Sequence, residues 1–269
     1  MLFGLSRQSY YKNKTSRIKR NADLIIVRDM VMRIRCKMPR IGTRKLYYLI
    51  KDELNMLNIK IGRDVLFNFL RAEYLLIKPK RSYVKTTNSK HWMKKYPNLI
   101  KNIEVTKPEQ LWVSDITYIQ TEQGHNYLSL VTDAYSKKIM GYELLDNLST
   151  AGPLKALESA LKNRKYTHDL IHHSDRGLQY CSYEYVELSL KNNVSISMTE
   201  NGDPYENALA ERMNRTLKEE FGLGGVLKTR EQAYQLAEEA VNLYNQRRPH
   251  LALNLLTPNI VHLQKIPAA

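Results

Sequence analysis

The sequence has few of the features that mark secreted, membrane-spanning or disulfide-rich proteins. Only 2 of its 269 residues are cysteine. Because Cys36 and Cys181 lie far apart without closely spaced histidines, we expect neither a disulfide framework nor a structural zinc site. No apolar run reaches the roughly 18 residues of a membrane span, and residues 1–20 lack the pattern of a signal peptide. We therefore expect a cytoplasmic protein.

Acidic residues are scarce in the first part of the chain. Residues 1–107 contain 26 Lys and Arg but only 7 Asp and Glu, whereas the remainder contains 16 and 20, so the total net charge is +15. A polyanion such as DNA is the expected partner, because each phosphate contact releases condensed counterions. The alternative is a basic surface that serves solubility. The 43% hydrophobic and 26% charged residues are typical of a folded globular chain.

The N-terminal part has the periodicity of helices. A long basic helix is predicted from Arg17 to the residue before Pro39. Its apolar residues at helical spacing are Ile18, Ile25, Val31 and Ile34. No sustained heptads of the leucine-zipper kind are found.

Two shorter helices are predicted next, at 43–54 and 63–71, with a turn at 56–61 between them. This is the outline of a helix-turn-helix, and its later helix would face the DNA major groove. The side chains offered there are Arg63, Asp64, Asn68 and Arg71. The alternative is a plain three-helix core. Residues 78–107, rich in Lys, are predicted to be a basic linker.

After Pro108 the pattern changes to strands. Three strands joined by tight turns are predicted at 111–120, 126–133 and 137–145. Helices at 153–164, 182–191 and 205–220 alternate with strands at 169–174 and 194–199, and a last helix spans 230–246. The sequence therefore predicts an α/β domain at 108–265 with a mixed five-stranded sheet.

The helix predicted at 205–220 has a well-marked beginning and two stripes. Asp203, Pro204 and Glu206 have the spacing of an N-cap, a first helical residue and a capping box. Every fourth residue from Leu209 to Phe221 is apolar, which predicts the buried face. A polar stripe lies roughly 160 to 200 degrees away. It consists of Asn207, Glu211, Asn214 and Lys218, and the alternative reading of this stripe is a solvated face.

Two further carboxylates occupy positions typical of active sites. Asp115 lies inside the best strand pattern, where an unpaired buried carboxylate would be costly. Asp175 follows an apolar run, where a strand ends and a loop begins. With Glu211 they suit Mg²⁺ or Mn²⁺, and two such ions would stabilise both oxygens of a phosphodiester displacement. The neighbouring His172 and His173 are assigned no ligand role.

Three ordered blocks of sequence resemble the integrase core of bacterial insertion-sequence transposases. They are Trp112-x-x-Asp115-Ile116-Thr117-Tyr118, His173-Ser174-Asp175-Arg176-Gly177-x-Gln179-Tyr180, and Pro204-Tyr205-Glu206-Asn207-Ala208-x-Ala210-Glu211-Arg212-x-Asn214-Arg215-x-Leu217-Lys218-x-Glu220. Asp175 and Glu211 are separated by 35 residues, the spacing of the DDE signature. Residues 4–11, 42–80 and 244–258 resemble other parts of the second-frame subunit, OrfB, of two-frame elements, so the resemblance covers the whole chain.

The resemblance implies an RNase H-like catalytic core behind a basic helical DNA-binding region at 1–77. It implies cleavage and strand transfer at element ends by Asp115, Asp175 and Glu211 with two Mg²⁺ or Mn²⁺ ions. The residues expected to contact DNA are Lys218, Arg176, Arg215, Arg63, Asn68 and Arg71, while Asn207 would position Glu211 or a water.

The implied partners are element ends and target DNA, further copies of the chain, and an upstream-frame OrfA subunit or fusion. The implied setting is the bacterial nucleoid. Two alternatives remain open. One is a non-catalytic regulator that occupies element ends, and the other is a nuclease acting on RNA or DNA junctions.

Overall fold

The computed structural model describes residues 7–77, 92–200 and 207–264. The chain divides into two compact units, Met1–Lys80 and Arg81–Ala269. No helix within the described ranges is both long and apolar enough to cross a membrane. The predicted capping residues Asp203, Pro204 and Glu206 lie outside the described residues, as do positions 78–91 of the predicted linker and 4–6 of the resemblance.

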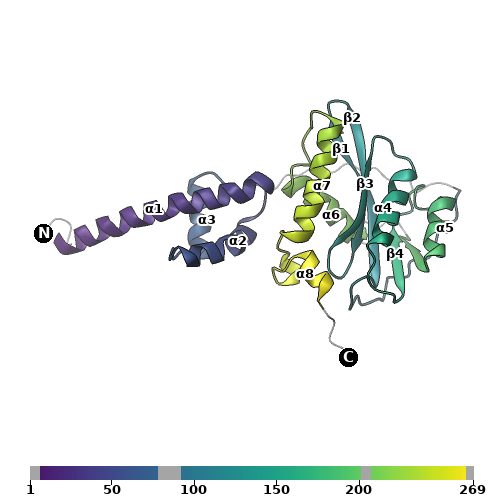
Figure 1. Ribbon diagram of the computed structural model, residues 1–269, viewed down its shortest axis with the longest axis horizontal. Coiled ribbons are helices and arrows are strands. Elements are labelled where there is room, and N and C mark those ends of the chain that lie inside the picture. Colours follow the sequence, from purple (N-terminus) through teal and green to yellow (C-terminus); the bar gives the residue numbers. More distant parts are fainter. Residues whose placement is uncertain (1–6, 78–91, 201–206, 265–269) are drawn as a thin grey trace. The chain divides into compact units, whose positions relative to one another are not determined.

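The first unit contains three helices, α1 (Arg7–Lys37), α2 (Thr43–Met56) and α3 (Arg63–Ala72). Gly42 and Gly62 occupy the N-cap positions of α2 and α3 with extended backbone, where the sequence predicted each helix to begin. The three helices are shown in Figure 1. The core of this unit is aliphatic, and it buries side chains from all three helices. The buried side chains include Val27, Met30, Val31, Leu46, Ile50, Leu54, Leu66 and Leu70.

The apolar stripe predicted for α1 was wrong in its N-terminal half. The helix begins at Arg7 rather than near Arg17, and Ile18 and Ile25 are 61% and 64% exposed. The helix instead contacts its unit through Val27, Met30 and Val31. Helical spacing alone cannot identify which of two apolar rows is buried, because that choice depends on where α2 and α3 pack.

The second unit is built on the predicted mixed sheet of five strands. Strands β1 (Leu111–Thr121), β2 (Gly124–Asp133) and β3 (Ile139–Leu145) are antiparallel, and β4 (Leu170–Ser174) and β5 (Val194–Met198) continue the sheet in parallel with β1. The strand order is β3-β2-β1-β4-β5. Thus β1 lies at the centre, between an antiparallel and a parallel neighbour.

Helices cover both faces of this sheet (Figure 1). Helices α4 (Ala151–Lys162) and α5 (Tyr183–Lys191) share one core with Trp112 of β1. On the other face lies α6 (Ala208–Glu220), which packs Ala210 against Leu111 and Val113, and α7 (Arg230–Gln246) follows on this side. Because side chains alternate along a strand, Leu111, Val113 and Asp115 of β1 face α6.

The described part of the predicted linker packs on the second unit. Met93 and Tyr96 lie against the core that α4 and α5 share. The backbone N–H of Leu99 donates to Ser197 Oγ over 2.9 Å, and the N–H of Met198 donates to the carbonyl of Pro97. Residues 92–107 are thereby attached to the edge strand β5.

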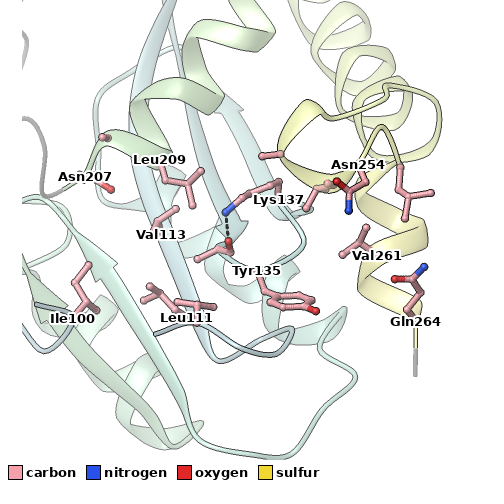
Figure 2. A pocket seen from close by; sticks show the side chains of 16 residues that line it. Ile100, Leu111, Val113, Tyr135, Lys137, Asn207, Leu209, Asn254, Val261 and Gln264 are labelled. Carbon is pink, nitrogen blue, oxygen red and sulfur yellow. Dashed lines mark hydrogen bonds between the residues drawn. The ribbon is translucent and has the colours of Figure 1, made fainter. Parts of the chain in front are cut away.

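The C-terminal segment folds back onto the sheet with a helix that was not predicted. Helix α8 (Pro258–Leu263) begins after Thr257, whose side chain accepts a hydrogen bond from the N–H of Ile260. Thr followed by Pro is a sequence signal for a helix start. Between α8, α6 and the beginning of β1 lies a largely apolar pocket of 630 Å³ (Figure 2).

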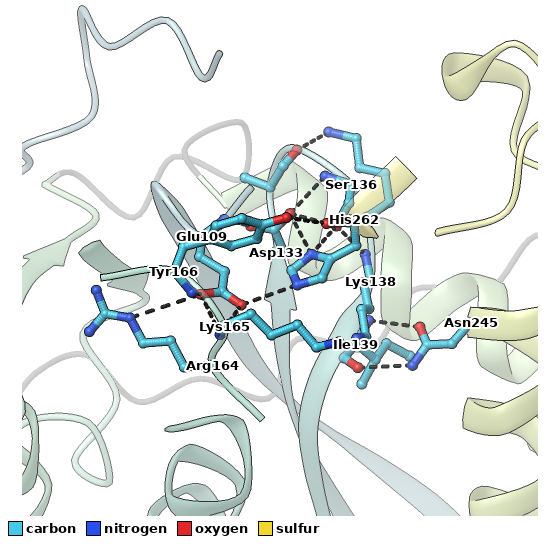
Figure 3. A network of polar contacts seen from close by, with 12 residues as sticks. Glu109, Asp133, Ser136, Lys138, Ile139, Arg164, Lys165, Tyr166, Asn245 and His262 are labelled. Atoms are coloured by element: carbon cyan, nitrogen blue, oxygen red, sulfur yellow. Dashed lines mark hydrogen bonds and ion pairs between the residues drawn. The ribbon is translucent and has the colours of Figure 1, made fainter. Parts of the chain in front are cut away.

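A buried polar network joins α8 to the sheet (Figure 3). His262 Nε2 lies 3.1 Å from Glu109 Oε1, and its Nδ1 lies 3.1 Å from Ser136 Oγ and 3.8 Å from Asp133 Oδ2. Glu109 also accepts hydrogen bonds from the backbone N–H groups of Lys165 and Tyr166. All four side chains of the Glu109, Asp133, Ser136 and His262 network are fully buried.

The charges in this network stabilise one another. Burial alone would lower the pKa of His262, but hydrogen bonds to Asp133 and Glu109 outweigh it and raise that pKa. Burial would likewise raise the pKa of Glu109, yet the hydrogen bonds to His262, Tyr166 and Lys165 lower it. The network therefore favours an imidazolium between two carboxylates, and a buried group of this kind needs every member.

Replacing His262 with alanine should destabilise the second unit by about 3 kcal/mol, because it leaves two buried carboxylates short of a partner. Urea unfolding followed by circular dichroism measures the change. His125, which is exposed, provides a matched control, and His125→Ala should cost less than about 0.5 kcal/mol. Equal stability of both variants would show that the network contributes nothing to holding α8.

Candidate active site

Asp115 lies within β1, and Asp175 directly follows β4, the parallel neighbour of β1. In the register of β1 and β4, Val113 pairs with His173, so the two carboxylates each lie two residues beyond this pair. Both line one small cleft of 150 Å³. The other lining residues are Ile116, Thr117, Tyr118, Tyr127, Leu148, Gly177, Leu178, Gln179 and Tyr180. Two acidic side chains far apart in the sequence thus share one cavity at the centre of the sheet.

Their proximity changes the acidity of Asp115. Burial, the charge of Asp175 and, less strongly, the charge of Glu211 together raise the pKa of Asp115 to about 7, against the hydrogen bonds from Ile116 and Asn214 that lower it. Repulsion of this kind is relieved when a proton or a cation occupies the site. The pair therefore has the electrostatic character of a cation-binding site.

The polar stripe of α6 faces β1 rather than solvent. Asn207, at the N-cap, donates from Nδ2 to the carbonyl of Ser114 over 3.0 Å, and Asn214 donates from Nδ2 to Asp115 Oδ2 over 2.8 Å. Both asparagines are buried. A solvated stripe, which the sequence left open, is therefore wrong for these two residues.

Glu211 lies on α6 between the two asparagines, one turn from each. It is exposed, and its charge acts on Asp115 less strongly than that of Asp175 does. Within the described ranges, no three side chains of His, Cys, Asp or Glu lie close enough together to hold a metal ion. Helix α6 thus places Glu211 on the side of the sheet where Asp115 and Asp175 lie. The exposed carboxylate of Glu211 does not form one cluster with the carboxylates of these two residues.

Lys218, one further turn along the same stripe, lies over an aromatic ring. Its Nζ is 4.0 Å from the ring centroid of Tyr118, which lines the cleft beside Asp115. Burial lowers the pKa of Lys218, and the charge of Asp115 partly offsets that effect. Because the ring face of Tyr118 attracts the ammonium group of Lys218, orienting the Lys218 side chain beside the cleft costs little further conformational entropy.

The remaining predicted DNA contacts are distributed over both units. Arg176 is half-buried directly after Asp175, whereas Arg215 is exposed on α6. In the first unit, Arg63, Asn68 and Arg71 are all exposed on α3. Arg63 pairs with Asp64 over 2.9 Å, and Arg71 donates to Asn68 over 2.8 Å. Their side chains are thus on the surface of the helix that the sequence proposed for groove recognition.

The two histidines before Asp175 have structural contacts. His172 Nε2 lies 2.7 Å from Ser114 Oγ and 2.9 Å from Tyr185 Oη, and burial lowers its pKa to about 3. His173 Nδ1 lies 2.8 Å from Ser197 Oγ. Both are fully buried in the sheet. They position the end of β4, and therefore Asp175, without facing the cleft.

Sequence reasoning missed the contacts of Asn214 and Tyr118. Asn214 was placed in the polar stripe but given no role, although its position three residues after Glu211 puts it on the same helix face. Tyr118 was part of the first motif block but was given no role. The larger pocket of Figure 2 contains Asn207 but neither Asp115 nor Asp175, so the chemistry of the site lies in the smaller cleft.

Comparison with known proteins places these features among mobile-element proteins. Two models described as Integrase core domain match residues 105–204 and 192–258. A 31 kDa protein of insertion element IS600 from Shigella sonnei is 34% identical over 262 residues, which are 96% of this chain and 94% of that protein. Transposase InsF for IS3A of Escherichia coli is 31% identical over 172 residues, which are 64% of this chain and 60% of that protein.

The fold comparison agrees with the sequence comparison. A chain from the simian T-cell lymphotropic virus intasome in complex with the regulatory subunit B56 gamma of PP2A superimposes with a TM-score of 0.50. The match covers 86% of this chain and 75% of that chain, at 18% sequence identity. The predicted integrase-like architecture, with a helical region before the core, is therefore confirmed at the level of the fold.

Proposed function

Because the chain belongs to the insertion-sequence transposases with an integrase core domain, we propose that Asp115, Asp175 and Glu211 are its catalytic residues. The protein is a transposase, a polynucleotidyl transferase that acts in insertion-sequence transposition. Members of this family act on DNA and multimerise. The reaction assigned to the three carboxylates is cleavage of a DNA strand at the element end, followed by transfer of the freed 3′-hydroxyl.

One observation carries the assignment. Asn207 and Asn214 hydrogen-bond to Ser114 and Asp115 of β1, and they enclose Glu211 on the same face of α6. The two anchors hold this face of α6 against β1, which supports the proposal that Glu211 acts together with Asp115 and Asp175. Since the carboxylate of Glu211 is exposed, rotation about its side-chain bonds can bring it to them without moving the helix.

The donor set fits a hard divalent cation. Integrase-like cores use divalent metal ions in general, and carboxylate oxygens are the ligands that Mg²⁺ and Mn²⁺ prefer. The pKa of about 7 at Asp115 supports the fit, because burial and the charge of Asp175 both disfavour an unpaired carboxylate there, and a cation would offset both. Asp115 and Asp175 would hold Mg²⁺ from the strands and Glu211 from the helix, with two ions per site. Bound there, the ions activate the attacking hydroxyl or water and neutralise the leaving oxygen.

The other residues of the site orient the carboxylates and the DNA. Asn214 donates to Oδ2 of Asp115, and the backbone N–H of Ile116 donates to Oδ1 over 2.9 Å, so both carboxylate oxygens are held in place. Lys218, held over Tyr118, would contact a phosphate of the DNA end, and Arg176 and Arg215 would add further phosphate contacts. Such contacts set the register of the DNA without reading its sequence.

The first unit would supply sequence recognition. Residues 1–77 form the proposed DNA-binding region, in which Arg63, Asn68 and Arg71 of α3 would reach base edges or phosphates in the major groove. Neutralising one phosphate contact should reduce the salt dependence of binding by about one unit of slope. We further propose that the chain pairs two element ends as a multimer, works with an OrfA subunit or fusion, and acts at the nucleoid.

The metal-free protein should lose stability as pH rises. Unfolded Asp titrates near 3.8, whereas folded Asp115 titrates at about 7. Between these values the folded state binds more protons, so its free energy of unfolding falls with pH by about 4 kcal/mol. At pH 8, Asp115→Asn should raise the thermal midpoint of the metal-free protein, but at pH 4 it should not.

Asp146→Asn, which changes an exposed carboxylate paired with Arg230, provides the control and should show no such pH dependence. Millimolar Mg²⁺ should stabilise the wild-type protein at pH 8 and have little effect on Asp115→Asn. If the two variants behave alike at both pH values, the carboxylates of the cleft do not repel one another as proposed.

The function itself is tested by incubating the purified chain with Mg²⁺ and labelled DNA that carries the element end, with and without the OrfA portion. Nicked and joined products confirm the proposal and show whether the partner is needed. Tight binding without products in either mixture would favour a regulator that occupies element ends. Cleavage without joining would favour a nuclease on the same fold.

A further inference from the structure

The N-terminal part of α1 contributes almost nothing to its own unit. The buried residues of this 31-residue helix are Val27, Met30, Val31 and Arg35, all in its C-terminal part. Every residue from Tyr10 to Ala22 is exposed. A solvated helical segment of this length is only marginally stable in water, so it needs a partner to remain helical.

The exposed part of α1 carries a repeat of large apolar side chains. Four of them recur at intervals of seven residues, and each is about half exposed or more. They are Tyr11 (53%), Ile18 (61%), Ile25 (64%) and Met32 (48%). Each of these side chains is followed four residues later by a second position of the repeat, namely Thr15, Ala22, Asp29 and Cys36. The spacings between successive positions therefore alternate between four and three residues, which is the pattern of a heptad seam. We call these eight residues the heptad row.

The heptad row faces away from the unit's own core. At about 100 degrees per residue, the row lies on roughly the opposite side of the helix from Val27 and Val31, which are fully buried. The sequence suggested no sustained heptads, because the second position of each repeat is small or polar. The repeat can be recognised only when the structure shows that the other apolar row, which contains Val27 and Val31, is the one buried in the core.

The charges beside the row distinguish between possible occupants. Lys12, Lys14 and Lys19 flank its exposed half. In a parallel pair of identical helices, Lys14 of one copy would face Lys19 of the other, and Asp29 would face Asp29. Both contacts are repulsive. The row is therefore poorly suited to a second copy and complementary to a helix of the opposite charge.

We propose that the heptad row binds an amphipathic helix with an aliphatic seam flanked by Asp and Glu. The aliphatic side chains would pack on Tyr11, Ile18, Ile25 and Met32, and the acidic flanks would pair with the three lysines. DNA would use other side chains of α1, since Arg17 and Arg20 project away from the row and are exposed. The interaction is independent of the catalytic assignment.

The test measures binding of labelled synthetic helices to the full chain by fluorescence anisotropy. The first peptide has four heptads with Leu in the seam and Glu beside it. The second keeps Glu but has Ser in the seam, and the third keeps Leu but has Lys beside it. We expect the first to bind at least about tenfold more tightly than either of the others.

Paired variants localise the effect. Ile18→Ser combined with Ile25→Ser should reduce binding of the first peptide to the level of the second while leaving the thermal midpoint and DNA affinity unchanged, because both residues are exposed. The control, Arg17→Ser combined with Arg20→Ser, lies outside the row. It should change peptide binding by less than about threefold and weaken DNA binding instead.

Three results would overturn the proposal. If the two Glu-flanked peptides bind equally well, the interaction depends on charge alone and the aliphatic seam does not contribute to it. A dimer of the chain by itself, dissociated by the serine pair at Ile18 and Ile25, would assign the row to a second copy. Loss of DNA affinity in that same pair, with no peptide bound, would assign the row to DNA.

Discussion

Replacing Asp115 with asparagine should lower the rate of DNA-strand cleavage by about three orders of magnitude or more. The substitution keeps the shape of the side chain and removes the negative charge that we propose holds a metal ion together with Asp175 in the cleft. Single-turnover cleavage of labelled end DNA with saturating Mg²⁺ measures the loss. Strand joining on a pre-nicked end should fall equally, because one site performs both steps.

Folding and catalysis can be separated in this variant. Asp115→Asn should be at least as stable as the wild-type protein at pH 8, since it relieves repulsion from Asp175 and Glu211. End-DNA affinity in EDTA should be unchanged. Asp146→Asn on the same domain should retain full activity. A variant that cleaves at the wild-type rate would remove Asp115 from the catalytic set.

Replacing Asn214 with leucine should reduce cleavage by about a hundredfold. The leucine is similar in size but cannot donate the 2.8 Å hydrogen bond to Asp115 Oδ2, so the carboxylate keeps only the hydrogen bond from the N–H of Ile116 to Oδ1 and is held less firmly. Because Asn214 acts through Asp115, the metal requirement should change with the rate. The Mg²⁺ concentration for half-maximal activity should rise, and Mn²⁺ should partly rescue the variant.

Asn207 provides the matched comparison. It is also a buried asparagine at α6, but its amide donates to the backbone of Ser114 rather than to a carboxylate. Asn207→Leu should therefore lower stability by about 1 to 2 kcal/mol without shifting the Mg²⁺ requirement. If the two leucine variants have the same metal dependence, the contact of Asn214 with Asp115 is structural only.

The elements of the second unit were predictable because their signals are local. Strand alternation from Leu111 and the helical spacing from Arg230 gave boundaries within a few residues of those observed. The positions of Asp115 inside a strand and of Asp175 directly after one were also predicted from the pattern, since carboxylates at such places are unusual in themselves. That these two strands are neighbours in the sheet was known only from the structure.

The contacts that define the site depend on tertiary packing and were not predictable. The sequence placed Asn214 on the correct stripe, but only the packing of α6 against β1 shows that this stripe is buried. The same applies to His262, whose partners Glu109 and Asp133 are 153 and about 130 residues away along the chain. In α1, two apolar rows competed, and helix packing rather than periodicity decided between them.

The most direct test of the account is strand joining by Glu211→Gln on a pre-nicked element end, in Mg²⁺ and in Mn²⁺. Glu211 is the carboxylate that the structure leaves exposed, so its role depends wholly on the proposal that α6 presents it to Asp115 and Asp175. We predict normal binding of the end DNA and a joining rate at least about a thousandfold below wild type with either metal. Joining at the wild-type rate would contradict the three-carboxylate site.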